Sequence, residues 1–420
     1  MQRSKLFTKT SKTTSADEVA KNAQLLARAG FIHKEMAGVY AYLPLGLRVL
    51  EKIKTIVREE MNAIGGQEVA LTALQPRELF DKTNRWDDSV VDNWFKTKLK
   101  NDTELGLGLT HEEPITNILL EHVSSYKDLP ISVYQIQNKF RNELRAKSGL
   151  LRGREFVMKD MYSFARTQAE HDEIYEQIAA AYHKVYQRLG IGDITFRTKA
   201  DGGYFTDKNS DEYQTLSAAG EDTIYLDPAK KLAINKEIYT DENLAKLGLN
   251  KSDLVEQKSS EVGNIFPLES KYPDALDLYY TDETGQKQHI IMGCYGIGIS
   301  RLMGVLAEVF ADDQGLVWPT AVAPFQVYLI GIGDQGEAEA AELYTKFVQA
   351  GIEVLWDDRD SKTARPGEKL ADADLMGIPY RIVVSDKTLE QGSIEVKPRT
   401  GEPKLVKIES DPKNLQELLT

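Results

Sequence analysis

The sequence reads Lys139-Phe-Arg-Asn-Glu143 and, a short loop later, Arg154-Glu-Phe156. These stretches lie in two runs of extended character, residues 131–143 and 152–164, and the loop between them is rich in Arg, Lys and Gly. Strand-forming runs joined by such a loop are typical of a β-hairpin. The sequence therefore predicts a long antiparallel hairpin.

Several side chains of this hairpin could bind a nucleotide. Alternate residues of a strand face the same side, so Arg141 and Glu143 should point together. On the return strand Arg152, Arg154 and Phe156 share a face by the same rule. An arginine can grip a phosphate, a glutamate can accept from an exocyclic amine, and a phenylalanine can stack on a purine. Surface ion pairs on an ordinary hairpin remain the alternative.

On the N-terminal side, the pattern predicts two helices and a strand. A helix of about 14 residues should end near Gly30 and be followed by a turn over 40–44. A long amphipathic helix should start at Pro44 and stop at Gly65-Gly66. A strand over 67–74 should follow and end at Pro76, because proline terminates strand pairing.

On the C-terminal side, a helix is predicted over 168–189, and the polar, Lys- and Glu-rich segment 225–262 is interpreted as a small appended insertion. Gly293-Cys-Tyr-Gly-Ile-Gly-Ile-Ser-Arg301 is expected to form a Gly-rich turn from an apolar strand into a helix over 299–310. The glycines would let a ligand approach the backbone, with Arg301 one turn into the helix. A structural turn with Arg301 at the surface is the alternative.

After a proline-bounded linker, 319–324, the pattern changes to an α/β domain. The linker matters because two prolines with small residues between them continue neither a helix nor a strand. The predicted elements are, in order, strand 325–332, helix 336–349, strand 352–355, helix 368–376 and strand 381–384.

Composition excludes several classes of protein. Cys294 is the sole cysteine of the 420 residues, so disulfides and cysteine zinc sites are excluded and a cytoplasmic location is expected. No apolar run is long enough for a membrane helix. A basic N-terminus resembling a transit peptide is the less favoured alternative, because Ser15-Ala-Asp-Glu18 is a capping box that would open a helix.

A net charge of −13 argues against a protein that coats nucleic acid, so any RNA contact should be local. Residues 139–166 form one basic island, with eight basic side chains against three acidic ones. The basic members are Lys139, Arg141, Arg145, Lys147, Arg152, Arg154, Lys159 and Arg166.

Three common metal- or nucleotide-binding motifs are absent from the sequence. His111-Glu-Glu-Pro114 lacks the second histidine of a zinc-protease motif, and its proline would interrupt the required helix. No P-loop and no Gly-x-Gly-x-x-Gly motif occurs. A nucleotide, if bound, must be held in another way.

Three features follow one another along the chain: a long helix with a strand that ends at Pro76, then the hairpin, then the Gly-rich segment. This order resembles motifs 1, 2 and 3 of class II aminoacyl-tRNA synthetases. Within that class the sequence resembles the bacterial-type prolyl-tRNA synthetases over nearly the whole chain. The matching stretches are Thr110-His-Glu-Glu113, Tyr134-Gln-Ile-Gln-Asn-Lys-Phe-Arg141, Arg154-Glu-Phe-Val-Met-Lys-Asp160, Gly293-Cys-Tyr-Gly-Ile-Gly298, Asp357-Asp-Arg359 and Arg365-Pro-Gly367.

The resemblance implies an α+β catalytic domain with an antiparallel sheet, over 1–224 and 263–320, and a C-terminal α/β anticodon-binding domain over 324–420. Segment 225–262 would replace the editing domain of longer relatives, so this would be a short form without editing of alanyl-tRNA. The implied activity joins L-proline to ATP, with Mg²⁺, as prolyl-adenylate and then to the proline tRNA. A cytoplasmic homodimer formed through motif 1 is also implied.

The resemblance also assigns roles to single residues. Arg141 and Arg301 would act on the phosphates as catalytic residues, with no metal ligand identified. The proline site would comprise Thr110, Glu112, Arg141, Cys294 and Gly296. The ATP site would comprise Arg141, Glu143, Arg152, Phe156 and Arg301, and anticodon contacts would come from Asp358, Arg359 and Arg365.

One departure from the family pattern affects the expected proline site. Ser210-Asp-Glu-Tyr213 has an aspartate, Asp211, where the family usually has a histidine, which puts the affinity for the substrate in question. A paralogue that has lost aminoacylation and only binds RNA or regulates is therefore one alternative. Another class II synthetase is the second, although the threonyl enzyme would need zinc ligands that this chain lacks.

Overall fold

The computed structural model describes residues 1–14, 18–360 and 362–407, so part of the capping box predicted at 15–18 lies outside the described residues. The chain divides into two compact units. One comprises Met1–Glu35, Tyr40–Lys52 and Leu306–Thr420, and the other comprises Met36–Val39 and Ile53–Val305. The N-terminal residues therefore group with the C-terminal part of the chain.

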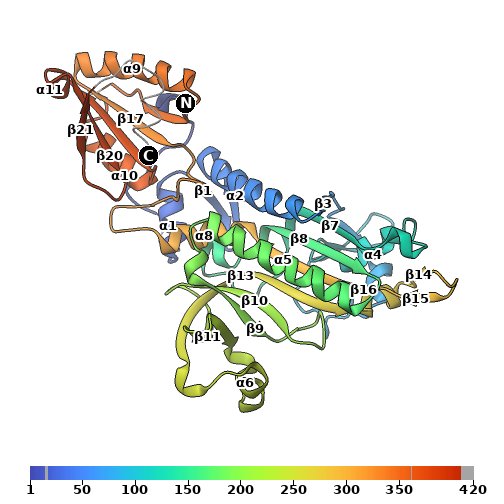
Figure 1. Ribbon diagram of the computed structural model, residues 1–420. Helices are drawn as coiled ribbons and strands as arrows, with labels where there is room; N and C mark the ends of the chain where they lie inside the picture. Colours follow the sequence, from blue (N-terminus) through green and yellow to red (C-terminus); the bar gives the residue numbers. More distant parts are fainter. Residues whose placement is uncertain (15–17, 361, 408–420) are drawn as a thin grey trace. The chain divides into compact units, whose positions relative to one another are not determined.

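A nine-stranded, mostly antiparallel sheet forms the centre of the second unit (Figure 1). Its strand order is β10-β9-β12-β11-β13-β16-β8-β7-β3. The strands are β3 (Gln67–Glu68), β7 (Ile131–Phe140), β8 (Glu155–Ala165), β9 (Thr195–Ala200), β10 (Ser210–Leu216), β11 (Asp222–Asp227), β12 (Leu232–Asn235), β13 (Val255–Glu269) and β16 (Ile291–Gly298).

The predicted hairpin is confirmed as the antiparallel pair β7 and β8, in which Ile131 faces Phe164 and Phe140 faces Glu155. The strands are shorter than predicted at the loop end, however, because β7 stops at Phe140 and β8 starts at Glu155. Arg141, Glu143 and Arg152 therefore lie in the connecting loop. The alternation rule used to place them on strand faces was wrong for these residues.

The Gly-rich segment is a strand and not the predicted turn. β16 runs through Gly298 and pairs antiparallel with β13 on one edge and β8 on the other. A Cβ at Gly293 would lie 2.1 Å from the Tyr295 hydroxyl oxygen, so that glycine makes room for a packed ring. The helix that follows, α8 (Ile299–Val309), begins where it was predicted.

Helix α5 (Gln168–Arg188) lies along the sheet and contacts β8, β13 and β16 (Figure 1). The Thr167 hydroxyl caps its N-terminus by accepting from the Glu170 N–H. Its prediction and that of α2 (Pro44–Ala63) are confirmed. The first helix, α1 (Lys21–Arg28), is much shorter than predicted, and the expected turn at 40–44 instead contains strand β2 (Val39–Tyr42), which pairs with β1 (Ile32–Met36).

The second unit also contains two smaller β-sheets. β4 (Leu74–Pro76), β6 (Glu104–Leu107) and β5 (Lys96–Lys98) form a three-stranded sheet, so the strand predicted over 67–74 is split between β3 and β4. β14 (Tyr279–Thr281) and β15 (Lys287–His289) form a two-stranded ribbon. The short helices α3 (Arg77–Asp81), α4 (Glu112–Leu119) and α7 (Lys271–Ala275) complete this part of the chain.

Segment 225–262 is not a loosely appended insertion. Strands β11 and β12 belong to the large sheet, and β13 runs through position 262 without a break. The pairings lead from β13 through β10, β9, β12 and β11 back to β13. The segment's helix α6 (Asp241–Leu247) packs with the strands around Ile234, Ile238, Leu244 and Leu249. Its polar composition reflects only its outer face.

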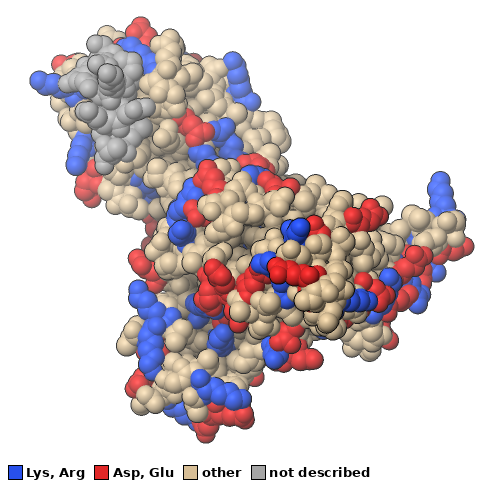
Figure 2. Space-filling model, turned by 45° about the vertical axis from the view of Figure 1, so that its right-hand side comes forward, with Lys and Arg blue, Asp and Glu red and all other residues tan. Residues whose placement is uncertain are grey.

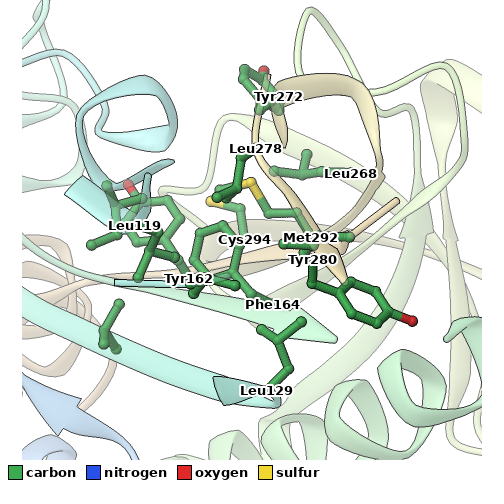
Figure 3. Packing of buried hydrophobic residues seen from close by; sticks show 14 residues of the cluster. Leu119, Leu129, Tyr162, Phe164, Leu268, Tyr272, Leu278, Tyr280, Met292 and Cys294 are labelled. Carbon is green, nitrogen blue, oxygen red and sulfur yellow. The ribbon is translucent and has the colours of Figure 1, made fainter. Parts of the chain in front are cut away.

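A cluster of buried apolar side chains supports the centre of the large sheet (Figure 3). It includes Tyr162 and Phe164 of β8 and Met292 and Cys294 of β16. Cys294 is thus a packed core residue whose thiol reaches the polar site described below.

The α/β pattern predicted after the linker is confirmed in the first unit. A five-stranded sheet has the order β18-β17-β19-β20-β21, with parallel pairing of β17 to β18 and β19. Its strands are β17 (Val327–Ile332), β18 (Val354–Asp357), β19 (Tyr380–Ser385), β20 (Ser393–Pro398) and β21 (Lys404–Lys407), and its helices are α9 (Asp334–Gln349), α10 (Pro366–Met376) and α11 (Asp386–Leu389). The sequence prediction missed β20 and β21.

Candidate active site

A cavity of about 440 Å³ opens in the second unit and collects side chains from distant parts of the chain. Eight of the residues predicted from the sequence line it, and they come from the segment before α4, the β7–β8 loop, β8, β16 and α8. They are Thr110, Arg141, Glu143, Arg152, Phe156, Cys294, Gly296 and Arg301. The tertiary fold therefore brings the predicted proline and ATP residues to one site.

Glu112 is the acidic residue behind the floor of this cavity. Its side chain is fully buried at the start of α4. The Thr110 hydroxyl donates to Oε2 (2.6 Å) and the Cys294 thiol donates to Oε1 (3.0 Å). Burial raises the pKa of Glu112, but the charge of Arg85 and these hydrogen bonds outweigh it and lower the pKa. Glu112 is therefore an anion in the apolar interior.

Arg85 is a residue of this region that the sequence reasoning missed. It is 2% exposed, and its Nη1 lies 3.1 Å from Glu112 Oε2 and 3.0 Å from Glu113 Oε2. Burial and the neighbouring Glu112 raise the pKa of Glu113 against the charge of Arg85. Two adjacent acidic residues that are expected to be buried indicate that a basic partner is needed. Which of the arginines is that partner depends on the tertiary structure.

Arg141 carries a donor that no described residue accepts. Its Nε is buried and lacks a hydrogen-bond partner within the described part of the chain. Its guanidinium carbon lies 5.3 Å from the centre of the Phe156 ring. A buried, unsatisfied donor costs free energy unless a ligand completes it, so Arg141 is arranged to bind an anion in the cavity.

Glu143 and Arg152 are paired with each other across the loop. Arg152 donates to Glu143 Oε2 through Nη2 (2.7 Å) and to Glu221 Oε2 through Nη1 (3.0 Å). Arg154 was predicted to share a face with Arg152 and Phe156. It instead donates to the backbone oxygens of Ala37 and Glu143. It fixes the loop from behind and does not line the cavity.

Arg301 lines the same cavity and is held by Glu261. Its Nη1 lies 3.1 Å from Glu261 Oε2. Nearby, Glu212 receives hydrogen bonds from Gln214 and Asn235, and burial together with the charge of Glu261 raises the pKa of Glu212 to about 8. Acidic groups thus surround the arginine that was assigned to the distal phosphate.

Asp211 does not lie beside the predicted proline site, which corrects the concern raised by the sequence. Its carboxylate accepts hydrogen bonds from the Tyr175 hydroxyl (2.9 Å) and Arg197 (2.8 Å) and forms an ion pair with Lys199 (2.7 Å), on the side of β10 that faces α5. The next residue, Glu212, lines the cavity. Because successive side chains of a strand point to opposite faces, Asp211 lies on the face of β10 that is turned away from the cavity.

The basic island over 139–166 is not a continuous RNA-binding surface. Lys139 and Lys159 are both fully buried. Lys139 contacts Asp160 (2.8 Å) and the ring of His111, whereas Lys159 donates to the Tyr182 hydroxyl and the Tyr295 carbonyl. On the face shown in Figure 2, basic and acidic side chains are interspersed.

The three residues predicted to read the anticodon differ in their availability. Arg359 forms ion pairs with Asp357, Glu368 and Asp372, and Asp358 accepts from the backbone and hydroxyl of Ser4. Arg365 precedes α10 and is exposed. Two of the three therefore shape the domain in this structure, and Arg365 is accessible.

The described residues contain neither a cluster of typical metal ligands nor a helix suited to a bilayer. No group of three or more His, Cys, Asp or Glu side chains there is arranged to hold a metal ion. Within the same residues, none of the helices combines the length and the apolar character needed to cross a bilayer.

Comparison with known proteins gives two family matches. Residues 95–310 match the model described as tRNA synthetase class II core domain (G, H, P, S and T). Residues 326–418 match the model described as anticodon binding domain. Together these models cover more than half of the chain.

Curated relatives agree along the full length. The proline–tRNA ligase of Anaplasma phagocytophilum (strain HZ) is 36% identical over 427 aligned positions, which cover 97% of this chain and 98% of that protein. The proline–tRNA ligase of Geobacillus sp. (strain WCH70) is 34% identical over 563 positions, with the same 97% and 98% coverage.

A solved structure matches the fold. Prolyl-tRNA synthetase from Cryptosporidium parvum, complexed with halofuginone and AMPPNP, has a TM-score of 0.77 and 17% sequence identity, and the match covers 95% of this chain and 76% of that one. At this identity the likeness concerns the fold, and it confirms the predicted class II architecture. The chain therefore belongs to the proline–tRNA ligases, class II aminoacyl-tRNA synthetases that carry an anticodon-binding domain.

Proposed function

We propose that this chain activates L-proline with ATP in the cavity of the second unit and transfers it, through prolyl-adenylate, to the 3′ end of the proline tRNA. The observation that carries this proposal is the convergence of Thr110, Arg141, Phe156, Cys294 and Arg301 on one cavity of about 440 Å³. The bound AMPPNP named for the Cryptosporidium structure supports a nucleotide as one ligand of this site.

The proline would bind over Thr110 and Glu112, with Cys294 and Gly296 forming the wall. The secondary ammonium group of zwitterionic proline carries a positive charge, and the anionic Glu112 held behind Thr110 attracts it. A Cβ at Gly296 would have Met158 Sδ as its nearest neighbour at 3.7 Å, so the backbone there leaves room for a small ring.

ATP would lie along the β7–β8 loop, with its adenine stacked on Phe156 and its amino group donating to Glu143. The proline carboxylate attacks the α-phosphorus, one P–O bond forms, and pyrophosphate leaves with the electrons of the broken bond. Arg141 neutralises charge that develops on the α-phosphate, and Arg301 binds the distal phosphates. The carboxylate is already a nucleophile, so the site needs positioning and positive charge more than a base.

The oxygen donors beside Arg301 fit a magnesium ion that enters with ATP. Asn264 Oδ1 is buried, has no hydrogen-bond partner among the described residues, and belongs to a cavity-lining residue next to Glu261. Carboxylate and amide oxygens suit Mg²⁺. Such an ion would supply positive charge to the phosphates, while Glu261 and Asn264 held it.

We also propose that the chain is a short form that does not hydrolyse alanyl-tRNA. A chain of 420 residues cannot fill an alignment of 563 positions, so the Geobacillus relative carries residues without a counterpart here, whereas the Anaplasma alignment needs only 427. A pocket discriminates by only about 1–3 kcal/mol per methylene, so alanine should be mischarged at a measurable rate.

The remaining assignments complete the proposal. Residues 1–320, with segment 225–262 as part of the large sheet, would form the catalytic part and 324–420 would bind the anticodon, with Arg365 as the accessible contact beside Asp358 and Arg359. The enzyme would act as a homodimer in the cytoplasm.

The test is proline-dependent exchange of pyrophosphate into ATP by the purified chain, with threonine, glycine, alanine and cysteine assayed in parallel. We expect exchange with proline and weaker exchange with alanine. The absence of exchange with every amino acid would overturn the proposal. Rapid hydrolysis of alanyl-tRNA by the chain would refute the absence of editing separately.

A further inference from the structure

Arg85 occupies the point where two buried carboxylates meet. Adjacent residues of α4, Glu112 and Glu113, direct their side chains at its single Nη1, and the Thr83 hydroxyl donates to Glu113 Oε1 at 2.7 Å. Arg85 itself sits in the turn after α3, where Phe80 and Trp86 belong to a buried apolar cluster. Its position is therefore set by packing as well as by charge.

The rest of the guanidinium faces aromatic rings. Its central carbon lies 5.3 Å from the ring centre of Tyr204, 5.2 Å from that of Phe205 and 5.3 Å from that of Tyr272. Arg85 Nε and Nη2 have no hydrogen-bond acceptor among the described residues, and the rings take that place. Tyr204 and Phe205 line the cavity, whereas Arg85 does not.

Arg85 therefore connects the carboxylate behind the proline site with the aromatic wall in front of it. A planar, delocalised cation can donate along its edge to the acids and offer its face to the rings at the same time. A lysine ammonium in the same place would keep the charge but would lose this geometry.

The charge of Arg85 also determines whether Glu112 can attract a cation. The groups that face Glu112 from the surrounding elements are Arg85, Glu113, Thr110, His111, Lys139 of β7, Tyr162 of β8, Lys271 and Tyr272 of α7 and Cys294 of β16. Burial raises the pKa of Glu112, and the charge of Arg85 is the largest influence that lowers it.

We infer that Arg85 is a positioning residue for proline recognition, which holds Glu112 anionic and oriented and anchors the Tyr204–Phe205 wall of the same pocket. This inference rests on the proposed function, in which Glu112 receives the ammonium group of proline.

The experiment compares Arg85→Met, Arg85→Lys and Arg77→Met in proline-dependent pyrophosphate exchange between pH 6 and 8.5. Arg77 is the matched control, because this exposed arginine of the same region pairs with Asp81 and Glu104 and contacts neither acid of α4. For Arg85→Met we expect the KM for proline to rise about 30-fold at pH 8, with kcat and the KM for ATP within about threefold of wild type.

The pH profile separates positioning from a general structural role. Without Arg85 the pKa of Glu112 rises, so the KM of Arg85→Met should increase by up to about tenfold per pH unit as the pH falls. Arg85→Lys should give an intermediate KM with the wild-type pH profile, and Arg77→Met should match wild type. A parallel rise of both KM values, or an unchanged pH profile in Arg85→Met, would overturn the inference.

Two further variants keep the outcomes distinct. If Arg85→Met does not fold, its combination with Glu113→Gln removes the second buried carboxylate and is assayed in its place. Glu112→Gln tests the proposed function: an unchanged KM for proline in that variant refutes the role of Glu112 itself. Loss in Glu112→Gln but not in the Arg85 variants refutes only the positioning role of Arg85.

Discussion

Replacing Arg141 with alanine should abolish most of the activity while leaving the fold intact. Arg141 Nε is buried without a hydrogen-bond partner in the described residues, and no described ion pair holds its guanidinium. Its removal therefore strands no acidic partner. By contrast, removal of Arg301 would leave Glu261 without its ion-pair partner, and removal of Arg152 would do the same to Glu143 and Glu221.

One preorganised donor to a developing charge contributes about 2.7–4 kcal/mol, which corresponds to a loss of about 10²- to 10³-fold in rate. We expect Arg141→Ala to lose this much kcat in proline-dependent pyrophosphate exchange, with the midpoint of thermal unfolding within about 2 °C of wild type. Arg145→Ala is the matched control, because Arg145 is an exposed arginine of the same loop. A loss of less than about tenfold, or an equal loss in Arg145→Ala, would refute the reasoning.

Three other variants test separate parts of the structure. Asp211→His should lower the free energy of unfolding in urea by about 2–3 kcal/mol, because Arg197 and Lys199 lose their shared partner. The KM for proline should stay within about threefold of wild type. A raised KM with unchanged stability would contradict the placement of Asp211. Gly296→Ala should fold normally, since the added Cβ meets its nearest neighbour at 3.7 Å, but should raise the KM for proline by about tenfold by filling the pocket. Burial lowers the pKa of Lys159 to about 7, so its protonation penalises the folded state below pH 7 and the penalty fades as the pH rises toward 10. The free energy of unfolding of wild type relative to Lys159→Met should therefore rise by about 1 kcal/mol per unit between pH 7 and 9, and a flat difference would disprove the assignment.

Local sequence signals were sufficient wherever the element is regular and bounded by strong stop signals. Gly65-Gly66 follows the end of α2, Thr167 caps α5, and the two extended runs form the β7–β8 pair. The same signals placed the alternating strands and helices after the linker. Proline, glycine and capping residues act through their own backbone and nearest neighbours, so their effect is readable from the chain alone.

The predictions for the Gly-rich segment and for segment 225–262 were wrong, because both segments contain strands whose formation depends on distant residues. Glycine in isolation favours a turn, but Gly293 lies in a central strand because the Tyr295 hydroxyl and the His171 ring occupy the space of a side chain. The polar strands β11 and β12 are stable because they pair within the large sheet. Whether a strand forms depends on its partner strand as well as on its own residues. The composition of one segment does not identify that partner.

The sequence by itself determined the family, the order of the three motifs and the identities of eight cavity residues, because these depend on which residue types occur in which order. Only the tertiary structure decided where the other side chains lie: Asp211 faces α5, Lys139 and Lys159 are in the interior, and Arg85 contacts the buried Glu112. The physical reason is that the charge state and reach of a side chain depend on burial and on partners distant in the chain, such as Glu112 with Cys294, which lie 182 residues apart.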